Sequence, residues 1–115
     1  MSAEYITVNL EEGMPTAELA IRRLTYFIKS SQERGVKLMK VIHGFGSSGA
    51  GGRIRKEART YLASMKRRGQ IRAFVPGEEF SVFDAGTRAL LDECPELRRD
   101  RDLERHNNGI TLILL

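Results

Sequence analysis

Two histidines, His43 and His106, are the side chains of this 115-residue sequence best suited to proton transfer near neutral pH. Proton transfer in catalysis needs a general base and a general acid, and two imidazoles can fill these roles. Glu11, in an acidic loop, is a third catalytic candidate. Each has a structural alternative, because a histidine at a strand end can order a loop and Glu11 can be a solvated charge.

His43 stands between an apolar, β-favouring segment, Leu38 to Ile42, and a loop with five glycines between Gly44 and Gly52. A helical pattern follows, so the order is strand, glycine loop and helix. Free N–H groups and the positive end of a helix dipole then meet at one point, which suits a phosphate or sulfate. Close backbone approach to the anion is assigned to four glycines of this stretch: Gly44, Gly46, Gly49 and Gly52.

The helical pattern after the loop is strongly basic. Between Arg53 and Arg72 there are eight basic residues and one acidic residue, Glu57, a local balance of +7 in a chain whose net charge is +4. Such a cluster indicates a docking face for a polyanion, although a solvated helix face is the alternative. Phosphate contacts are assigned to Arg53, Arg55, Arg59, Lys66 and Arg67.

Two other kinds of site were weighed. Gly44-Phe45-Gly46-Ser47-Ser48-Gly49 has the spacing of a dinucleotide-binding fingerprint, but the position about 20 residues later lies in a basic helix and not at an acidic strand end. We therefore keep nucleotide binding as a minor alternative. No His, Cys and carboxylate spacing indicates a metal site, and no cofactor is expected.

The elements that must position these residues follow from periodicity and turn residues. Strands are predicted at 5–10, 38–42, 71–75 and 110–115, and helices at about 15–34 and 52–68. The connection from Glu78 to Asn108 is polar. In it, Asp84 is expected to cap a short helix through Leu91, and Arg98 to Arg105 is expected to be an exposed turn.

Length and composition predict one α/β domain over residues 1–115. No apolar run is long enough for a membrane span and the N-terminus lacks the features of a signal peptide, so a cytoplasmic location without membrane contact is expected. The single cysteine, Cys94, is interpreted as a reduced structural thiol. The sequence indicates no oligomeric state.

The middle of the chain resembles the Smr (small MutS-related) domain family. The family pattern of an apolar strand, His-Gly-x-Gly, further glycine and an aliphatic–basic pair is similar to Val41-Ile42-His43-Gly44-Phe45-Gly46 and Gly51-Gly52-Arg53-Ile54-Arg55. A third motif is similar to Asn107-Asn108-Gly109-Ile110-Thr111, which adds Asn107 and Gly109 to the binding candidates. The connection at about 78–108 looks enlarged beside the family pattern.

The resemblance implies a two-layer βαβαββ sandwich with a mixed four-stranded sheet, similar to the C-terminal domain of translation initiation factor three. Strands one to three would be parallel and the last antiparallel, with two helices on one face. Asn9, Glu11, Glu12, His43, the glycine loop, His106 and Asn107 would then share one edge of the sheet, where open α/β sheets usually bind ligands.

The resemblance also implies a function. Family members are expected to bind structured or branched DNA, or RNA, in settings that include DNA repair and the ribosome, and many nick DNA or cleave RNA. Where the family has Leu-Asp-x-His-Gly, this chain has Val8-Asn9-Leu10-Glu11-Glu12-Gly13, so the histidine of the first motif is absent. Endonuclease activity therefore stands beside an alternative, a non-catalytic adaptor that docks on the ribosome or a partner protein.

Overall fold

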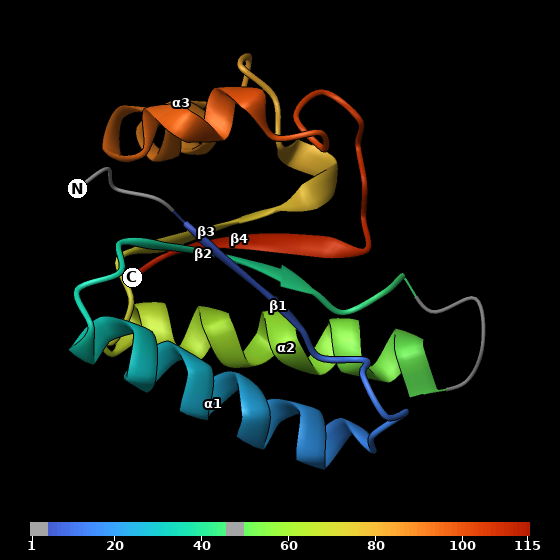
Figure 1. Cartoon of the computed structure of the whole chain (residues 1–115). Helices are drawn as coiled ribbons and strands as arrows, with labels where there is room; N and C mark the ends of the chain where they lie inside the picture. The colour runs from blue at the N-terminus through green and yellow to red at the C-terminus, as the bar shows by residue number, and fades with distance from the viewer. Residues whose placement is uncertain (1–4, 46–49) are drawn as a thin grey trace.

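The centre of the fold is a four-stranded sheet in the order β1-β2-β4-β3 (Figure 1). The computed structural model describes residues 5–45 and 50–115. Strand β2 pairs in parallel with β1, and β4 pairs antiparallel with both β2 and β3. The predicted mixed α/β sheet is therefore confirmed. The strands are β1 (Ile6–Asn9), β2 (Leu38–Ile42), β3 (Ala73–Pro76) and β4 (Ile110–Leu114).

Two long helices, α1 (Ala17–Glu33) and α2 (Ala50–Arg67), cover one face of this sheet. Thr16 caps α1, because its side-chain oxygen accepts a hydrogen bond from the Leu19 N–H at 3.2 Å. After the helix, Gly35 has a φ of +78°, a left-handed conformation that glycine adopts without strain. The helix therefore begins and ends close to the predicted bounds of about 15–34.

The sheet is buried on both faces, and alternate residues of β2 show why. Met39 and Val41 belong to the core beneath α1 and α2, whereas Leu38 and Ile42 pack into a second core on the opposite face. A strand covered on both sides is usually an almost continuous apolar run. This explains why β2 is apolar apart from Lys40 and why β4 is apolar apart from Thr111.

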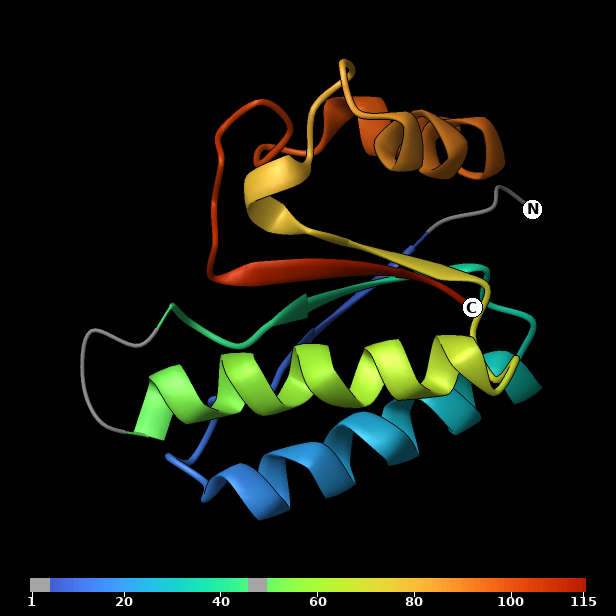
Figure 2. The ribbon, with the colours of Figure 1, turned by 180° about the vertical axis from the view of Figure 1, so that it is seen from behind.

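The opposite face is covered by the connection between β3 and β4, which Figures 1 and 2 place across the sheet from α1 and α2. The predicted short helix is present, because the Asp84 carboxylate accepts from the Thr87 N–H at 2.8 Å and caps α3. This connection adds a partial third layer to the expected two. Its helical elements are η1 (Gly77–Glu79), α3 (Ala85–Glu93) and η2 (Pro95–Arg99).

One expectation for this connection holds only in part, because residues 101–106 do form a turn with exposed Arg101, Glu104 and Arg105. The alternating charges from Arg98 to Arg105 indicated an exposed turn, but the side chains of Asp100 and Asp102 are only 4% and 13% exposed. Both carboxylates pair with Lys40, which projects from β2 into the second core region. Charge alternation predicted solvation because the sequence does not reveal a buried cation 60 residues earlier.

Helices in the described ranges, 5–45 and 50–115, are too short or too polar to cross a bilayer.

Candidate nucleic-acid interface

The carboxyl ends of β1 and β2 meet the start of β4 at one edge of the sheet, here called the glycine-loop edge. The carbonyl of Gly109 accepts hydrogen bonds from the N–H groups of both His43 and Gly44, each at 3.0 Å. The Leu10 N–H donates to the Ile42 carbonyl at 2.8 Å, which brings the loop after β1 to the same edge. Residues predicted to meet here are therefore held together by backbone hydrogen bonds.

The glycine loop and the loop after β1 come into close contact at Gly44. Its φ is +76°, and a methyl group on its Cα would lie 2.1 Å from an Oε of Glu11. The Glu11 side chain therefore lies directly against the first residue of the glycine loop. The N–H of Glu11 donates to the Asn9 carboxamide at 2.8 Å, so Asn9 shapes the turn that carries this carboxylate. Gly46 and Gly49 lie outside the described residues.

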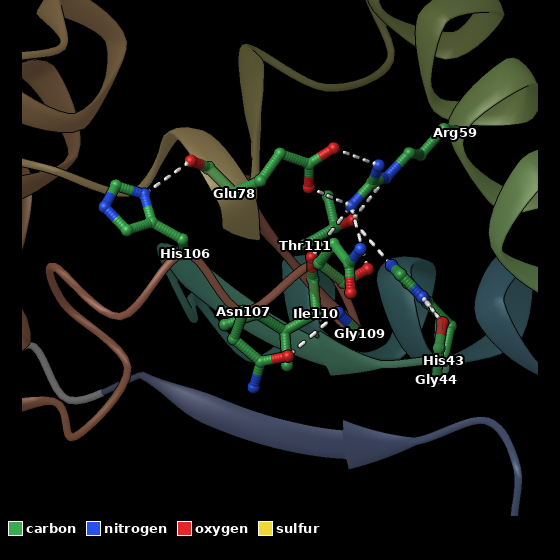
Figure 3. Close-up of polar contacts among 10 residues, drawn as sticks. His43, Gly44, Arg59, Glu78, His106, Asn107, Gly109, Ile110 and Thr111 are labelled. Carbon is green, nitrogen blue, oxygen red and sulfur yellow. Dashed lines mark hydrogen bonds and ion pairs between the residues drawn. The ribbon is translucent and has the colours of Figure 1, made fainter. Parts of the chain in front are cut away.

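His43 is fully buried, and both of its ring nitrogens are hydrogen bonded. Nδ1 lies 2.8 Å from the Gly44 carbonyl and Nε2 lies 2.8 Å from the Thr111 hydroxyl. A carbonyl can only accept, so Nδ1 carries the proton and Nε2 accepts from Thr111. Figure 3 shows the imidazole directed toward Thr111 of β4.

Burial also sets the charge of His43. Desolvation of the imidazolium has the largest effect on the pKa of His43 and lowers it. The hydrogen bond to the Gly44 carbonyl opposes this effect, the guanidinium groups of Arg59 and Arg55 add to it, and the net pKa is about 4. The ring is therefore neutral at pH 7. A neutral imidazole with no exposed nitrogen is suited to ordering the loop, and this geometry favours the structural alternative over proton transfer.

Arg59 connects α2 to the same network. Its guanidinium forms a bidentate pair with Glu78, at 2.8 Å for each bond, and its Nε donates to the Thr111 hydroxyl at 3.3 Å. Nη2 also donates to the carbonyls of Asn108 and Ile110. Burial raises the pKa of Glu78, but the hydrogen bonds from Arg59, a backbone hydrogen bond and the charges of Arg59 and Arg55 together outweigh burial and lower the pKa. Arg59 was assigned to phosphate, whereas the structure commits its N–H groups to internal acceptors.

His106 does not join His43. It is exposed, has a φ of +55°, and its Nδ1 lies 3.2 Å from the Glu78 carbonyl oxygen. Figure 3 shows the two imidazoles at opposite ends of the network, with Glu78 and Thr111 between them. The proposed acid and base pair of histidines is therefore not assembled in this structure.

The basic residues of α2 fall into two groups at opposite ends of the helix. Arg55 lies near His43 and Glu78, since it perturbs the pKa of both. Arg53 is paired with Glu57 at 3.2 Å on the surface. Lys66 and Arg67 lie in the last turn, and 11 residues of helix separate Lys66 from Arg55, a rise of about 16 Å. One phosphate cannot contact both groups.

Asn107 and Gly109 hold the start of β4 in place. The Asn107 carboxamide oxygen accepts from the Gly109 N–H at 2.9 Å, and its NH₂ group donates to Asp102 at 3.0 Å. A methyl group at Gly109 would lie 3.1 Å from the Asn107 oxygen and 3.4 Å from Phe45 Cδ1. Gly109 is thus needed for close packing beneath the loop.

Lys40 was not among the predicted site residues. Its side chain is only 8% exposed and lies close to this edge. Its Nζ donates to both oxygens of Asp100, at 2.9 and 3.1 Å, and forms an ion pair with Asp102. Burial raises the pKa of Asp102, but the bonds from Lys40 and Asn107 outweigh it and the net pKa is lowered. The one available signal was a lysine inside an apolar strand, which requires a buried partner.

Metal binding finds no support in the described part of the chain, where His, Cys, Asp and Glu form no group of three that would hold an ion.

Comparison with known proteins identifies the fold. The structure is similar to the crystal structure of the Smr domain of Thermus thermophilus MutS2, with a TM-score of 0.58 and 16% sequence identity over 95% of each chain. At that identity the likeness shows the fold alone. A search of curated proteins found no match. Residues 12–80, more than half of the sequence, match the sequence model of the Smr domain, and the chain therefore belongs to the Smr domain family.

Proposed function

We propose that this Smr domain binds nucleic acid at the glycine-loop edge, with phosphates contacting the first turns of α2. The family is associated with nucleic-acid binding and nicking. The observation that carries the proposal is a half-buried arginine, Arg55, which lies beside the glycine-loop edge and has no hydrogen-bonded or ion-paired partner among the described residues. A guanidinium held in this position without an internal acceptor is suited to a phosphate.

Neighbouring groups support the same site. Lys56 is exposed and likewise unpaired within the described ranges, and the surface pair of Arg53 with Glu57 is weak enough to be exchanged for a phosphate. The first turn of any α-helix also has N–H groups without helical acceptors, which adds a partial positive charge where α2 begins. Arg53, Arg55 and Lys56 are therefore the proposed phosphate-binding set.

The structure supports nucleic-acid binding better than nucleic-acid cleavage. The imidazole of His43 has both nitrogens occupied, so its loss would disturb the loop before it disturbed any proton transfer. Among the catalytic candidates, Glu11 is the one whose exposed carboxylate lies against Gly44. We keep cleavage through Glu11 as the second candidate function for this reason.

The test compares two charge-matched triple variants. One replaces Arg53, Arg55 and Lys56 by alanine, and the other replaces Lys66, Arg67 and Arg68 at the end of α2, so that each removes three positive charges. Fluorescence anisotropy with a labelled oligonucleotide, titrated from 50 to 200 mM salt, measures affinity and its salt dependence. The first variant should lose affinity and flatten the slope of log K against log salt by up to about two to three units.

The second variant is the control for net charge and should retain most of the affinity. Equal losses in both variants would mean that binding does not depend on the glycine-loop edge. Failure of the wild-type protein to bind single-stranded, duplex or branched nucleic acid would refute the proposal and favour the adaptor. Gel analysis of the same mixtures, with and without magnesium, measures cleavage, and Glu11→Gln should abolish any cleavage found.

A further inference from the structure

A pocket of about 490 Å³ adjoins the glycine-loop edge on the face of the sheet opposite to α1 and α2. It is lined by side chains of β1, β2 and β4, by Glu11 and Phe45 from the loops after β1 and β2, and by the connection before β4. The connection contributes Arg101, Asp102 and Asn107. The pocket therefore lies between the loop proposed to meet phosphate and a segment pinned by the buried Lys40 pair.

The charges that line the pocket are balanced. Glu11 and Asp102 oppose Lys40 and Arg101, and the Lys40 and Asp102 charges already neutralise each other. In the described residues, the side chains of Glu11 and Arg101 have no hydrogen-bonded partner. A phosphate gains little from such a lining, because an exposed carboxylate repels it. A neutral ligand with its own donors and acceptors fits better.

The apolar part of the pocket is suited to a flat ligand. Ile42 and Ile110 line it, and the ring of Phe45 is 56% exposed beside them. Phe45 is held against Gly109, since a methyl group there would lie 3.4 Å from the ring. An exposed aromatic side chain next to a phosphate-binding surface is the usual arrangement for stacking an unpaired base.

We propose that this pocket binds an unpaired nucleobase of the bound strand, stacked on Phe45. The inference rests on the proposed function and adds to it that the ligand is single-stranded at this point. The Glu11 carboxylate accepts hydrogen bonds only, so it selects a base that presents donors on its Watson–Crick edge. Guanine presents two adjacent donors, N1–H and the N2 amino group, and is the base that matches Glu11 best.

The experiment distinguishes the contribution of the base to affinity from the contribution of the phosphates. Three labelled nonamers of equal charge are compared at one salt concentration. The first is entirely abasic, the second contains only uracil or thymine, and the third is the second with one central guanine. Each is made in ribose and in deoxyribose form. The wild-type protein should bind the pyrimidine strand roughly tenfold more tightly than the abasic strand, the range expected for one stacked base. The central guanine should increase affinity again.

Three variants assign the effect to the pocket. Phe45→Ala should reduce the preference for bases over the abasic strand to about twofold or less, whereas Phe83→Ala, which removes an aromatic ring 88% exposed on the connection, should leave it unchanged. Glu11→Gln should retain stacking and lose the guanine preference. Circular dichroism confirms that each variant is folded.

Equal binding of abasic and base-containing strands by the wild-type protein would overturn the base pocket and leave phosphate binding intact. A base preference that survives Phe45→Ala would also overturn it. If the protein binds none of the three strands, then the proposed function and the pocket both fail.

Discussion

Replacing His43 by glutamine should remove a large part of the pH dependence of folding stability. The folded-state pKa of His43 is about 4, whereas an unfolded chain has a histidine pKa of 6.5. Between these values the unfolded chain binds a proton that the folded protein does not bind. The free energy of unfolding therefore falls as the pH is lowered from about 6.5 to about 4, and His43 contributes no pH dependence outside that window.

The magnitude follows from the size of the shift. Each pKa unit corresponds to about 1.4 kcal/mol, so a shift from 6.5 to about 4 amounts to about 3 kcal/mol of stability lost across the window. Carboxylates titrate in the same range, but they do so in both proteins. The difference between wild type and His43→Gln isolates the imidazole, because glutamine keeps one donor and one acceptor for Gly44 and Thr111.

The assay is urea denaturation followed by far-ultraviolet circular dichroism at several pH values from 4 to 7, since the sequence has no tryptophan. His106→Gln is the matched control, because it removes an exposed imidazole that lies at the other end of the network. The control should reproduce the wild-type pH dependence. Parallel curves for wild type and His43→Gln would refute the buried, neutral state of His43 and restore it as a candidate for proton transfer.

Two further predictions concern the scaffold of the site. Lys40→Met leaves Asp100 and Asp102 buried without their cation, so the free energy of unfolding measured in urea should fall by about 3–5 kcal/mol. Adding Asp100→Asn and Asp102→Asn to this variant should restore most of the lost stability. A single variant as stable as wild type would show that these carboxylates are solvated. Gly77→Ala would place a methyl group 1.9 Å from the Asn107 carbonyl oxygen, so it should lower the free energy of unfolding by about 1–3 kcal/mol or more. An unchanged melting temperature would contradict this close packing at Gly77.

The sequence predicted the strands and helices well because each depends on local signals. The Asp84 cap of α3, for example, was predicted from residue type and position alone. Boundaries were less accurate: β3 begins at Ala73 and not at Ile71, and α2 begins at Ala50 and not at Gly52. The strand directions came from the family resemblance, whereas the sheet order β1-β2-β4-β3 was not predicted.

The site could be predicted only in outline. The strand end before the glycine loop places His43, but the direction of its ring depends on Thr111, 68 residues later. Whether Arg59 is available to a ligand depends in the same way on its ion pair with Glu78, which lies in the next helical segment. Spacing on a helix indicates which side chains share a face, but it does not show which of them meet an acceptor from another element.

The most direct test of the central claim is a nuclear magnetic resonance titration of the ¹⁵N-labelled protein with a short oligonucleotide. Binding at the glycine-loop edge predicts that the backbone amide signals of Gly44, Phe45, Arg55 and Gly109 shift most. Signals of α3 and of the last turn of α2 should then change little. The largest shifts in α3 or at Lys66 and Arg67, or no shifts at saturating oligonucleotide, would contradict the account.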